Sequence, residues 1–456
     1  MEKKYRASIY NIYLEENEEY YIFQGSTGAL SSFEGEGIKF LKDDVHTKDE
    51  YIKFFNEDIF NRMLKRGFIT NYDTNEEKEY HRKLSKAIDE KNSKSISIVI
   101  AVTYYCNFRC PYCFENVSRK NLNEYKKSLI TKEVVDDIFT FIKNKKEDGI
   151  EINSIMLFGG EPLLKENFEI IKYIAERGQL ESVKIGAVTN GYDLDSYFEL
   201  CKNNLISHLQ ITIDGIGKIH NRRRVHAEGF DTFTKIEKNI DYLLENSSVE
   251  IESIGNYDNK NIYNIKELIE FYKSKGWSDN DRFSYYFRSL HACYKTNKEE
   301  KMDDYILGEY LDRDVKFNHV VKYDEINNLL KRIFLEKKVP YLSPEYCSAC
   351  GRMYVFDSYR NVYPCWETVG IENMKIGKLT EGGNVLLNSL YKKWKDRKTY
   401  NIERCNECSY SLICRGECPM HTYVSTGEMY DPQCGNNKKI IDESLIYNIE
   451  KSIYGK

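Results

Sequence analysis

A regular alternation of strand-like and helix-like segments begins near residue 96 and constrains the fold more than any other feature of the chain. The six strand-like segments are 96–103, 155–158, 184–188, 209–213, 249–254 and 283–287. The helix-like segments between them are 132–145, 166–177, 194–203, 230–246 and 262–275. Alternation of this length forms a parallel sheet with right-handed crossovers. Six units are fewer than the eight of a closed barrel, so we expect an α/β fold with a partial (β/α)6 barrel and its chemistry at the C-terminal ends of the strands.

The segments on either side of this pattern divide the rest of the chain. Alternating stretches at 8–15 and 19–24 predict a hairpin, a helical spacing predicts one helix at 49–66, and a charged stretch at 73–95 predicts a surface linker helix. The expected divisions are a winged-helix-like hairpin-and-helix module at 1–75, the linker at 76–95, the barrel at 96–290, a charged bridging region at 291–345, a cysteine-rich region at 346–435 and a last helix, 438–452, within 436–456.

Composition narrows the classes of function. A net charge of −5 gives no electrostatic case for nucleic acid or an anionic membrane surface. No apolar run approaches the roughly 18 residues that span a bilayer, and the N-terminus lacks the apolar stretch of a secretion signal, so we expect a cytoplasmic location. The 13 cysteines are therefore not expected to be structural disulfides, and metal or redox chemistry is the leading explanation for them.

Three cysteines follow the first barrel strand with the spacing C-x3-C-x2-C. They are Cys106, Cys110 and Cys113. Thiolates are the usual ligands of iron–sulfur clusters, and three of them leave one iron of a four-iron cluster open to chelate a small molecule. Zinc is the alternative, but structural zinc favours four ligands and no fourth cysteine or histidine is local.

This triplet, with Tyr112 before its last cysteine, resembles the motif that defines the radical SAM superfamily. The resemblance implies a 4Fe–4S cluster on the three cysteines, S-adenosylmethionine (SAM) on the fourth iron, and Tyr112 beside the adenine. A reduced cluster would give one electron to SAM and release a 5′-deoxyadenosyl radical, which takes a hydrogen atom from the substrate. An electron donor such as flavodoxin or ferredoxin is then an expected partner.

Further motifs follow the later strands in the order that the superfamily uses. The implied SAM-binding positions are Gly159, Gly160 and Glu161 after the second strand, Thr189 and Asn190 after the third, Thr212 and Arg224 at the fourth, and Asn256 on the fifth. The family binds the SAM amino group at the glycine–glycine–glutamate motif, and Arg224 would hold the carboxylate. Plain turns are the alternative at the second and third strands. Arg222 and Arg223 are expected to be solvated.

Eight more cysteines resemble the SPASM extension of radical SAM peptide maturases, which carries two further four-iron clusters. The resemblance assigns Cys347, Cys350, Cys365 and Cys418 to one auxiliary 4Fe–4S cluster and Cys405, Cys408, Cys414 and Cys434 to the other. Two interleaved zinc sites are the alternative. Arg360 stands where the family usually has glycine, and we expect a turn shifted to Asn361, because asparagine tolerates that conformation.

The resemblance to peptide maturases also implies a substrate. Relatives carry a hairpin-and-helix domain that captures a leader peptide by strand addition, so residues 1–75 are predicted to bind a precursor peptide. A purely structural cap is the alternative for this module. The expected reaction is then an intrapeptide thioether or carbon–carbon cross-link.

Two competing functions remain open. The anaerobic sulfatase maturase, which oxidises a single cysteine or serine to formylglycine, has an aspartate as proposed base after the third cysteine of the array. Here Trp366 and Glu367 follow Cys365, which argues against that chemistry. A zinc-bound peptide-binding protein is the non-enzymatic alternative. Cys293 and Glu367 are the candidate catalytic residues, whereas Cys201 lies in a helical pattern and is expected to be a buried thiol.

Overall fold

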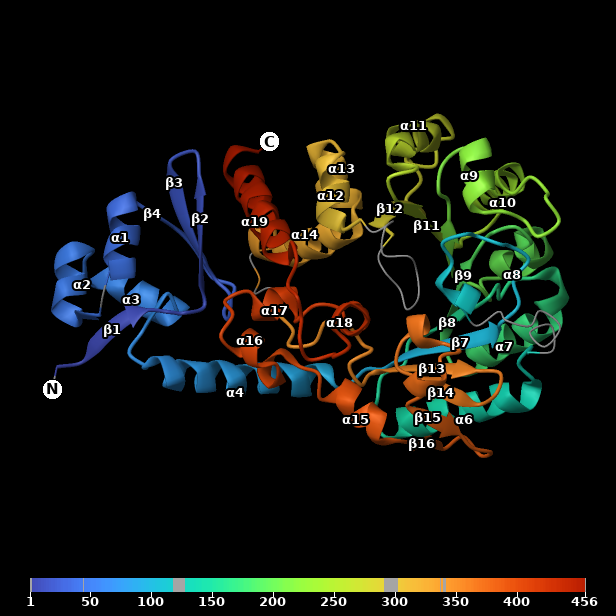
Figure 1. Cartoon of the computed structure of the whole chain (residues 1–456), viewed down its shortest axis with the longest axis horizontal. Helices are drawn as coiled ribbons and strands as arrows, with labels where there is room; N and C mark the ends of the chain where they lie inside the picture. The colour runs from blue at the N-terminus through green and yellow to red at the C-terminus, as the bar shows by residue number, and fades with distance from the viewer. Residues whose placement is uncertain are drawn as a thin grey trace.

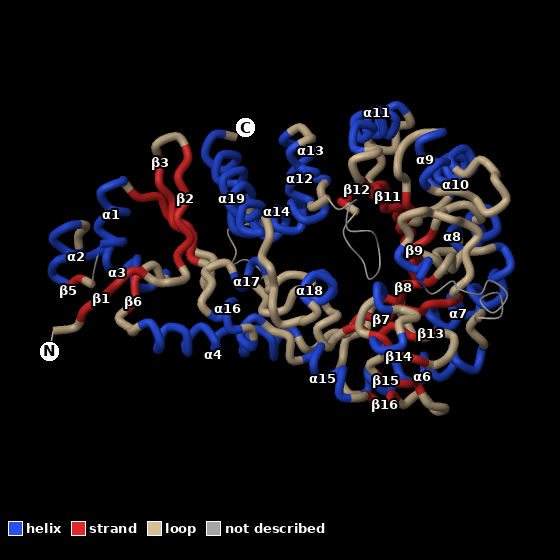
Figure 2. The backbone as a smooth tube through the Cα atoms, viewed as in Figure 1, coloured by secondary structure: helices blue, strands red, loops and turns tan. Residues whose placement is uncertain are grey.

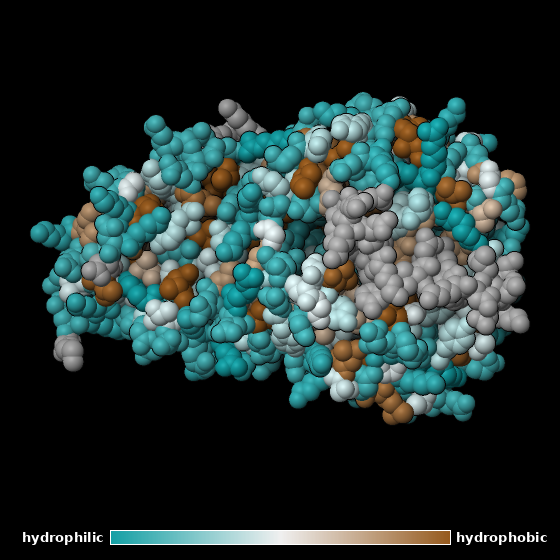
Figure 3. All heavy atoms as spheres, viewed as in Figure 1, coloured by the Kyte–Doolittle hydropathy of each residue, from teal (hydrophilic) through white to brown (hydrophobic). Residues whose placement is uncertain are grey.

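The computed structural model describes residues 2–43, 45–117, 128–290, 302–336, 338 and 342–455. Figure 1 shows an elongated arrangement, with an N-terminal module at one end, the barrel at the other and the C-terminal helices between them. Within the described ranges, no helix has both the length and the apolar character needed to cross a membrane. Apolar side chains on the face in Figure 3 are scattered among hydrophilic ones.

A ten-stranded sheet forms the barrel and extends beyond it, in the order β12-β11-β10-β9-β8-β7-β13-β14-β15-β16. The barrel strands are β7 Ser97–Thr103, β8 Ser154–Gly159, β9 Lys184–Thr189, β10 His208–Thr212, β11 Glu250–Tyr257 and β12 Phe283–Ser289. All neighbours among these six are parallel. The partial barrel predicted from the alternation is therefore confirmed.

Helices cover the outer face of this sheet (Figure 2). They are α6 Lys132–Glu147, α7 Phe168–Leu180, α8 Phe198–Lys202, α9 Lys218–Arg223, α10 Phe233–Asn246 and α11 Ile265–Ser274. Strand β7 is buried at six of its seven positions, because it lies in the sheet interior with helices on one side and the barrel lumen on the other. Its apolar sequence, Ser-Ile-Val-Ile-Ala-Val-Thr, is typical of a parallel strand covered on both faces.

The cysteine-rich region does not form a separate sheet. Its strands are β13 Met353–Asp357, β14 Asn361–Tyr363, β15 Gly377–Leu379 and β16 Val385–Leu387, and β13 pairs in parallel with β7. The expected shifted turn at Asn361 is wrong, because Arg360 itself adopts the left-handed conformation with φ of 66°. The Asp357 carboxylate accepts hydrogen bonds from the N–H groups of Tyr359 and Asn361, which holds this turn.

The N-terminal module contains more elements than its pattern predicted. Strands β2 Asn11–Glu16, β3 Glu19–Gln24 and β4 Leu30–Phe33 form one antiparallel sheet, of which β2 and β3 are the expected hairpin. The other elements are β1 Lys4–Ala7, α1 Gly35–Asp43, β5 His46–Thr47, α2 Lys48–Phe54, α3 Glu57–Arg66 and β6 Ile69–Thr70. The single helix expected at 49–66 is wrong, because the Asn56 side chain accepts from the Ile59 N–H at 2.9 Å and starts a new helix.

Helix α4 Thr74–Asn92 joins the module to the rest of the chain (Figure 1). It was expected on the surface, but one of its faces is buried at Glu77, His81 and Ser85. The His81 ring lies between Ser26 of the module and Ser411 of the C-terminal region, at 2.7 and 3.1 Å. The helix is therefore a packed contact between the two parts, because its polar side chains find partners on both.

The bridging and C-terminal residues are mainly helical. The bridging helices are α12 Asp304–Glu309, α13 Arg313–His319 and α14 Val321–Phe334, and α14 packs against the last helix, α19 Asn437–Tyr454. The short helices of the cysteine-rich region are α15 Ser389–Lys395, α16 Glu403–Asn406, α17 Ser411–Cys414 and α18 Pro419–Thr426. The last helix confirms the one expected at 438–452.

Candidate active site

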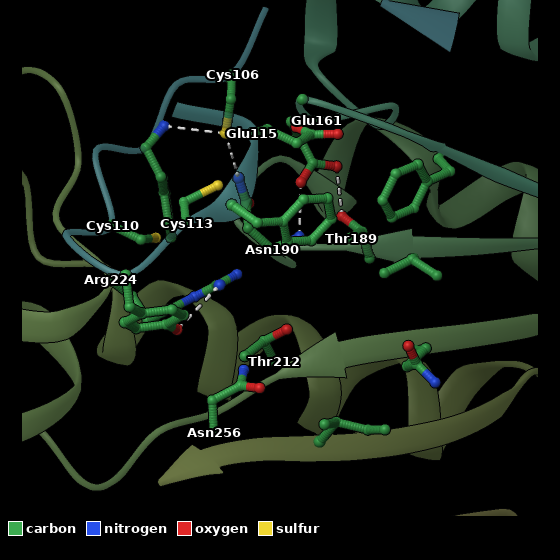
Figure 4. A pocket seen from close by; sticks show the side chains of 18 of the residues that line it. Cys106, Cys110, Cys113, Glu115, Glu161, Thr189, Asn190, Thr212, Arg224 and Asn256 are labelled. Atoms are coloured by element: carbon green, nitrogen blue, oxygen red, sulfur yellow. Dashed lines mark hydrogen bonds between the residues drawn. The ribbon is translucent and has the colours of Figure 1, made fainter. Parts of the chain in front are cut away.

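A cavity of about 250 Å³ lies at the C-terminal ends of the barrel strands. The sequence-predicted residues that line it are Cys106, Cys110, Tyr112, Cys113, Gly159, Gly160, Glu161, Thr189, Asn190, Thr212, Arg224, Asn256 and Glu367. Figure 4 shows the labelled side chains arranged around one central space, with the three cysteines on the same loop. The structure therefore brings together residues that are up to 261 positions apart, from Cys106 to Glu367.

The cysteine loop is held in a defined shape by its own backbone and by a distant segment. The Arg109 side chain donates to the carbonyl oxygens of Cys106 and Phe108 at 2.6 and 2.7 Å, and the Arg109 N–H donates to the Val225 carbonyl at 2.7 Å. Phe108 is buried. These contacts fix the directions of the thiols, which a multi-iron ligand set requires.

The end of β8 approaches this loop closely because it carries glycines. A Cβ atom on Gly160 would lie 2.3 Å from the Tyr105 carbonyl oxygen, so no other residue fits without moving the backbone. Next to it, the buried Glu161 carboxylate accepts hydrogen bonds from Thr189 Oγ1 at 2.6 Å and from the Leu163 N–H at 2.9 Å.

The charge of Glu161 depends on what lies in the cavity. Burial raises the pKa of Glu161 to about 7, although the hydrogen bonds from Thr189, Asn190 and Leu163 act in the opposite direction. A cationic amine near this carboxylate would favour its ionised form. The site therefore has the chemistry to bind an ammonium group, such as the amino group of SAM.

A buried ionic network surrounds Tyr112. Its hydroxyl donates to the Asp214 carboxylate, and the Arg223 guanidinium lies 5.0 Å from the ring centroid. Arg223 also forms an ion pair of 2.9 Å with Asp258, so the expectation that Arg223 is solvated is wrong. Arg222, by contrast, is exposed as expected. The network fixes the plane of the Tyr112 ring at the cavity wall.

Arg224 has the features of an anion-binding residue. It lines the cavity, its Nη1 lies 3.4 Å from the Tyr112 hydroxyl, and its buried Nε has no hydrogen-bond partner. Burial acts to lower the pKa of Arg224, but the charges of Cys110, Tyr112 and Asp214 raise it well above its usual value. The guanidinium is thus charged and lines the cavity, where it can pair with a carboxylate.

The rest of the cavity wall is aromatic and charged. Phe158 stacks between Phe114 and Trp366, with ring centroids 6.3 and 5.9 Å apart. Glu367 and Arg288 line the same cavity. None of these residues is among those implied for SAM binding, so this part of the wall is available to a second reactant.

The eight other cysteines of the array form two groups in space. Burial raises the pKa of Cys347 well above its usual value, and the nearby Cys350 and Cys418 raise it further. Burial likewise raises the pKa of Cys365 well above its usual value, and Glu367, Cys347 and Cys418 raise it further. These four are the quartet that the resemblance assigned to the first auxiliary cluster. Bound metal would reverse the shift, because it binds the thiolate form.

The second quartet lines a cavity of its own. Cys405, Cys408, Cys414 and Cys434 surround a space of about 470 Å³. Burial and the charges of the other three thiols raise the pKa of Cys405 to about 12. Among the described residues, no three His, Cys, Asp or Glu side chains are placed to hold a single metal ion. A four-iron cluster does not require three ligands around a single metal ion, because each of its thiolates binds a different iron.

Some functional candidates were missed or cannot be placed. The sequence reasoning gave no role to Asp214, Arg288 or the stack around Phe158, although all three lie at strand ends, where a barrel places its chemistry. Their strand-end positions were the available signal. Cys293 lies outside the described residues, and Cys201 is a buried thiol on α8, as expected.

A strand-end site with three loop cysteines, an acidic residue after two glycines and a buried arginine defines a radical SAM type of site. Comparison with known proteins agrees, since residues 100–274 match the Radical SAM superfamily. The chain contains a radical SAM domain and is a radical SAM enzyme with similarity to anaerobic sulfatase-maturating enzymes.

Two curated relatives and one solved structure illustrate this similarity. The cysteine-type anaerobic sulfatase-maturating enzyme of Clostridium perfringens (strain 13 / Type A) is 25% identical over 343 residues, covering 69% of this chain and 85% of the relative. The GTP 3′,8-cyclase of Campylobacter jejuni (strain RM1221) is 29% identical over 215 residues, covering 46% of this chain and 61% of the relative. Native anSMEcpe with bound AdoMet and Cp18Cys peptide has a TM-score of 0.58 at 18% identity, covering 79% of this chain and 100% of that chain, and supports the fold alone.

Proposed function

We propose that Cys106, Cys110 and Cys113 hold a 4Fe–4S cluster and that SAM binds the open iron inside the cavity. The observation that carries this proposal is the convergence of the three thiols, Glu161 and Arg224 on one cavity. When bound, the cluster and SAM supply a 5′-deoxyadenosyl radical that removes a hydrogen atom from the substrate.

The chain's own residues would position SAM at three points. Glu161 binds the SAM amino group, which stabilises the ionised form of Glu161. The Arg224 guanidinium, which lines the cavity, binds the SAM carboxylate. Tyr112 presents its ring to the adenine in the orientation that Asp214 and Arg223 impose. Thr189 and Asn190 brace Glu161 by hydrogen bonds, so their contribution is to hold the carboxylate in place.

For the substrate, we favour oxidation of a cysteine or serine side chain in a peptide, the reaction of the sulfatase-maturating relatives. The sequence argument against it was that Glu367 is displaced by one position from the expected base. Glu367 nevertheless lines the cavity that contains the three loop cysteines. The hydrogen atom would leave the substrate Cβ, and the thiol or hydroxyl proton would pass to Glu367. A cluster held by the Cys347 quartet would accept the second electron. Serine would give the aldehyde directly, whereas water would hydrolyse the thioaldehyde formed from cysteine, with release of sulfide.

Cross-linking of a leader-bearing peptide is the second candidate, because the N-terminal module has a suitable edge. Strand β4 is the outer strand of its sheet, and a cavity of about 510 Å³ lies between β4 and helix α3. An extended leader would add a strand to β4 and place its side chains in this cavity. Arg62 and Arg66 line the cavity together with Glu34 and Glu36, so its charged side chains balance and do not select the charge of the leader.

One assay separates the two candidates. The enzyme is purified without oxygen and incubated with SAM, a reductant and either a cysteine-containing sulfatase peptide or a precursor peptide taken from a neighbouring short reading frame. An aldehyde product with loss of sulfide supports the first candidate, whereas loss of two hydrogens with a new internal bond supports the second. Absence of 5′-deoxyadenosine under all of these conditions would refute the radical mechanism itself. About twelve irons with matching sulfide per chain supports three clusters, whereas zinc without iron supports the binding protein.

A further inference from the structure

Arg288 lies at the C-terminal end of β12, beside Asn256 of β11, and lines the cavity together with Trp366 and Glu367. The neighbouring Ser289 is fixed by Asp304, whose carboxylate accepts from both the Ser289 N–H and its hydroxyl, at 3.0 and 2.7 Å. The strand end that carries Arg288 is therefore held rigidly, which limits the positions that its side chain can reach.

The guanidinium of Arg288 is not used by the protein. It forms no hydrogen bond or ion pair with another residue in the described part of the chain, and its nitrogen atoms remain accessible to the cavity. Arg282, one residue before the same strand, behaves differently, because it donates to the Ser247 carbonyl at 2.6 Å and to Leu244. Arg282 thus uses its donors to hold the backbone, and Arg288 does not.

Nearby carboxylates keep the Arg288 guanidinium charged, although none of them forms an ion pair with it in the described part of the chain. Burial acts to lower its pKa, but the carboxylates of Asp304, Glu367 and Glu325 raise it above the usual value. Asp304 is committed to Ser289. Glu325 has its own cationic neighbours, Lys322 and Arg415. Two of the three carboxylates near Arg288 thus have other partners, and the guanidinium stays charged beside the cavity.

We propose that Arg288 anchors the substrate by binding a carboxylate of the peptide close to the residue that loses its hydrogen atom. This inference rests on the proposed peptide oxidation and adds a specificity to it. A guanidinium presents parallel N–H groups that match the two oxygens of a carboxylate, and such a pair is stronger and more directional than a contact with a single carbonyl. The carboxylate belongs either to an acidic side chain or to the peptide's C-terminus.

Synthetic peptides with one cysteine test this inference. One set moves a single glutamate along the positions flanking the cysteine, a second set has glutamine at the same positions, and each is made with a free or an amidated C-terminus. The reconstituted enzyme and its Arg288→Gln variant are compared for peptide affinity by fluorescence anisotropy and for peptide-dependent 5′-deoxyadenosine formation. Arg222→Gln, which removes an exposed arginine near the same barrel mouth, is the matched control.

The expected result is a loss of about 10- to 100-fold in affinity for the best glutamate peptide in Arg288→Gln, the range for a charge-assisted hydrogen bond. The glutamine peptide should bind the unaltered enzyme equally weakly and lose nothing further in the variant. Arg288→Glu should prefer the peptide with lysine in place of glutamate. If affinity depends only on whether the peptide's C-terminus is free or amidated, the carboxylate that Arg288 binds is that of the peptide's C-terminus. Arg222→Gln should change none of these values.

Three outcomes would overturn the inference. One is an equal loss for acidic, amide and amidated peptides, which would make Arg288 a general structural residue. Another is a weaker affinity for SAM in Arg288→Gln without any peptide, which would make it part of the cofactor site. The third is that no carboxylate-bearing peptide binds. If peptides bind with this preference but none is oxidised, the proposed reaction fails and the anchor stands.

Discussion

Glu161 accepts a hydrogen bond of 2.6 Å from the backbone N–H of Asn190, which connects the end of β8 to the end of β9. Asn190 in turn donates to Asn107 Oδ1 at 2.7 Å, inside the cysteine loop. Glu161 and Asn190 together thus link the ends of β8 and β9 to the cysteine loop that follows β7. The arrangement means that substitutions at Glu161 should affect both the ammonium site and the geometry of the thiols.

We expect Glu161→Gln to weaken SAM binding and to lower the free energy of unfolding by about 1–3 kcal/mol, because an amide replaces a buried acceptor of three hydrogen bonds. SAM affinity is measured by equilibrium dialysis and stability by denaturant unfolding. The control is Glu169→Gln, an exposed glutamate on α7. Unchanged SAM affinity in Glu161→Gln would remove this residue from the proposed binding site.

Replacing Cys106, Cys110 and Cys113 together with alanine should remove one of three clusters. Iron content should fall from about twelve to about eight atoms per chain, because the two other quartets are separate in space. SAM cleavage should disappear. The control is Cys201→Ala, which removes a buried thiol outside all three groups. An unchanged rate of 5′-deoxyadenosine formation in the triple variant contradicts the assignment.

Stability should fall in mild acid because of His81. Burial lowers the pKa of His81 to about 4, below the roughly 6.5 of an unfolded histidine. The unfolded state therefore binds more protons between these values, so the free energy of unfolding decreases as the pH falls from about 6.5 towards 4, by at most about 3 kcal/mol. Unfolding at several pH values measures this slope. His81→Gln should reduce it.

Phe54→Ala tests the leader-binding module. Phe54 lines the module cavity and is 45% exposed, so its removal should leave the fold intact. If a leader occupies this cavity, its affinity should fall by about 1–2 kcal/mol, as for an aromatic contact residue. Fluorescence anisotropy with a labelled leader measures the change. Leu180→Ala, at a site 78% exposed on the barrel, is the control. Equal affinities for both variants would place leader binding elsewhere or remove it.

The sequence alone determined the order of the barrel strands and the loop on which the three cysteines lie. These features are local, because a strand or helix depends on the spacing of apolar residues within a few turns, and the cysteine triplet spans eight residues from Cys106 to Cys113. The SAM-binding positions were implied by the resemblance to the radical SAM superfamily. Parallel strands bring their C-terminal ends to one edge, which is why motifs at successive strand ends are expected to meet there.

Only the tertiary structure decided which distant side chains meet and which remain unused. Arg223 was expected in solvent, yet it lies against Tyr112 and pairs with Asp258, because α9 folds back over the cavity wall. Arg360 takes a left-handed turn because Asp357 holds the flanking N–H groups. Arg282 and Arg288 are six residues apart around one strand, and only the first finds carbonyl partners. Such pairings depend on packing between segments far apart in the chain, which residue spacing does not encode.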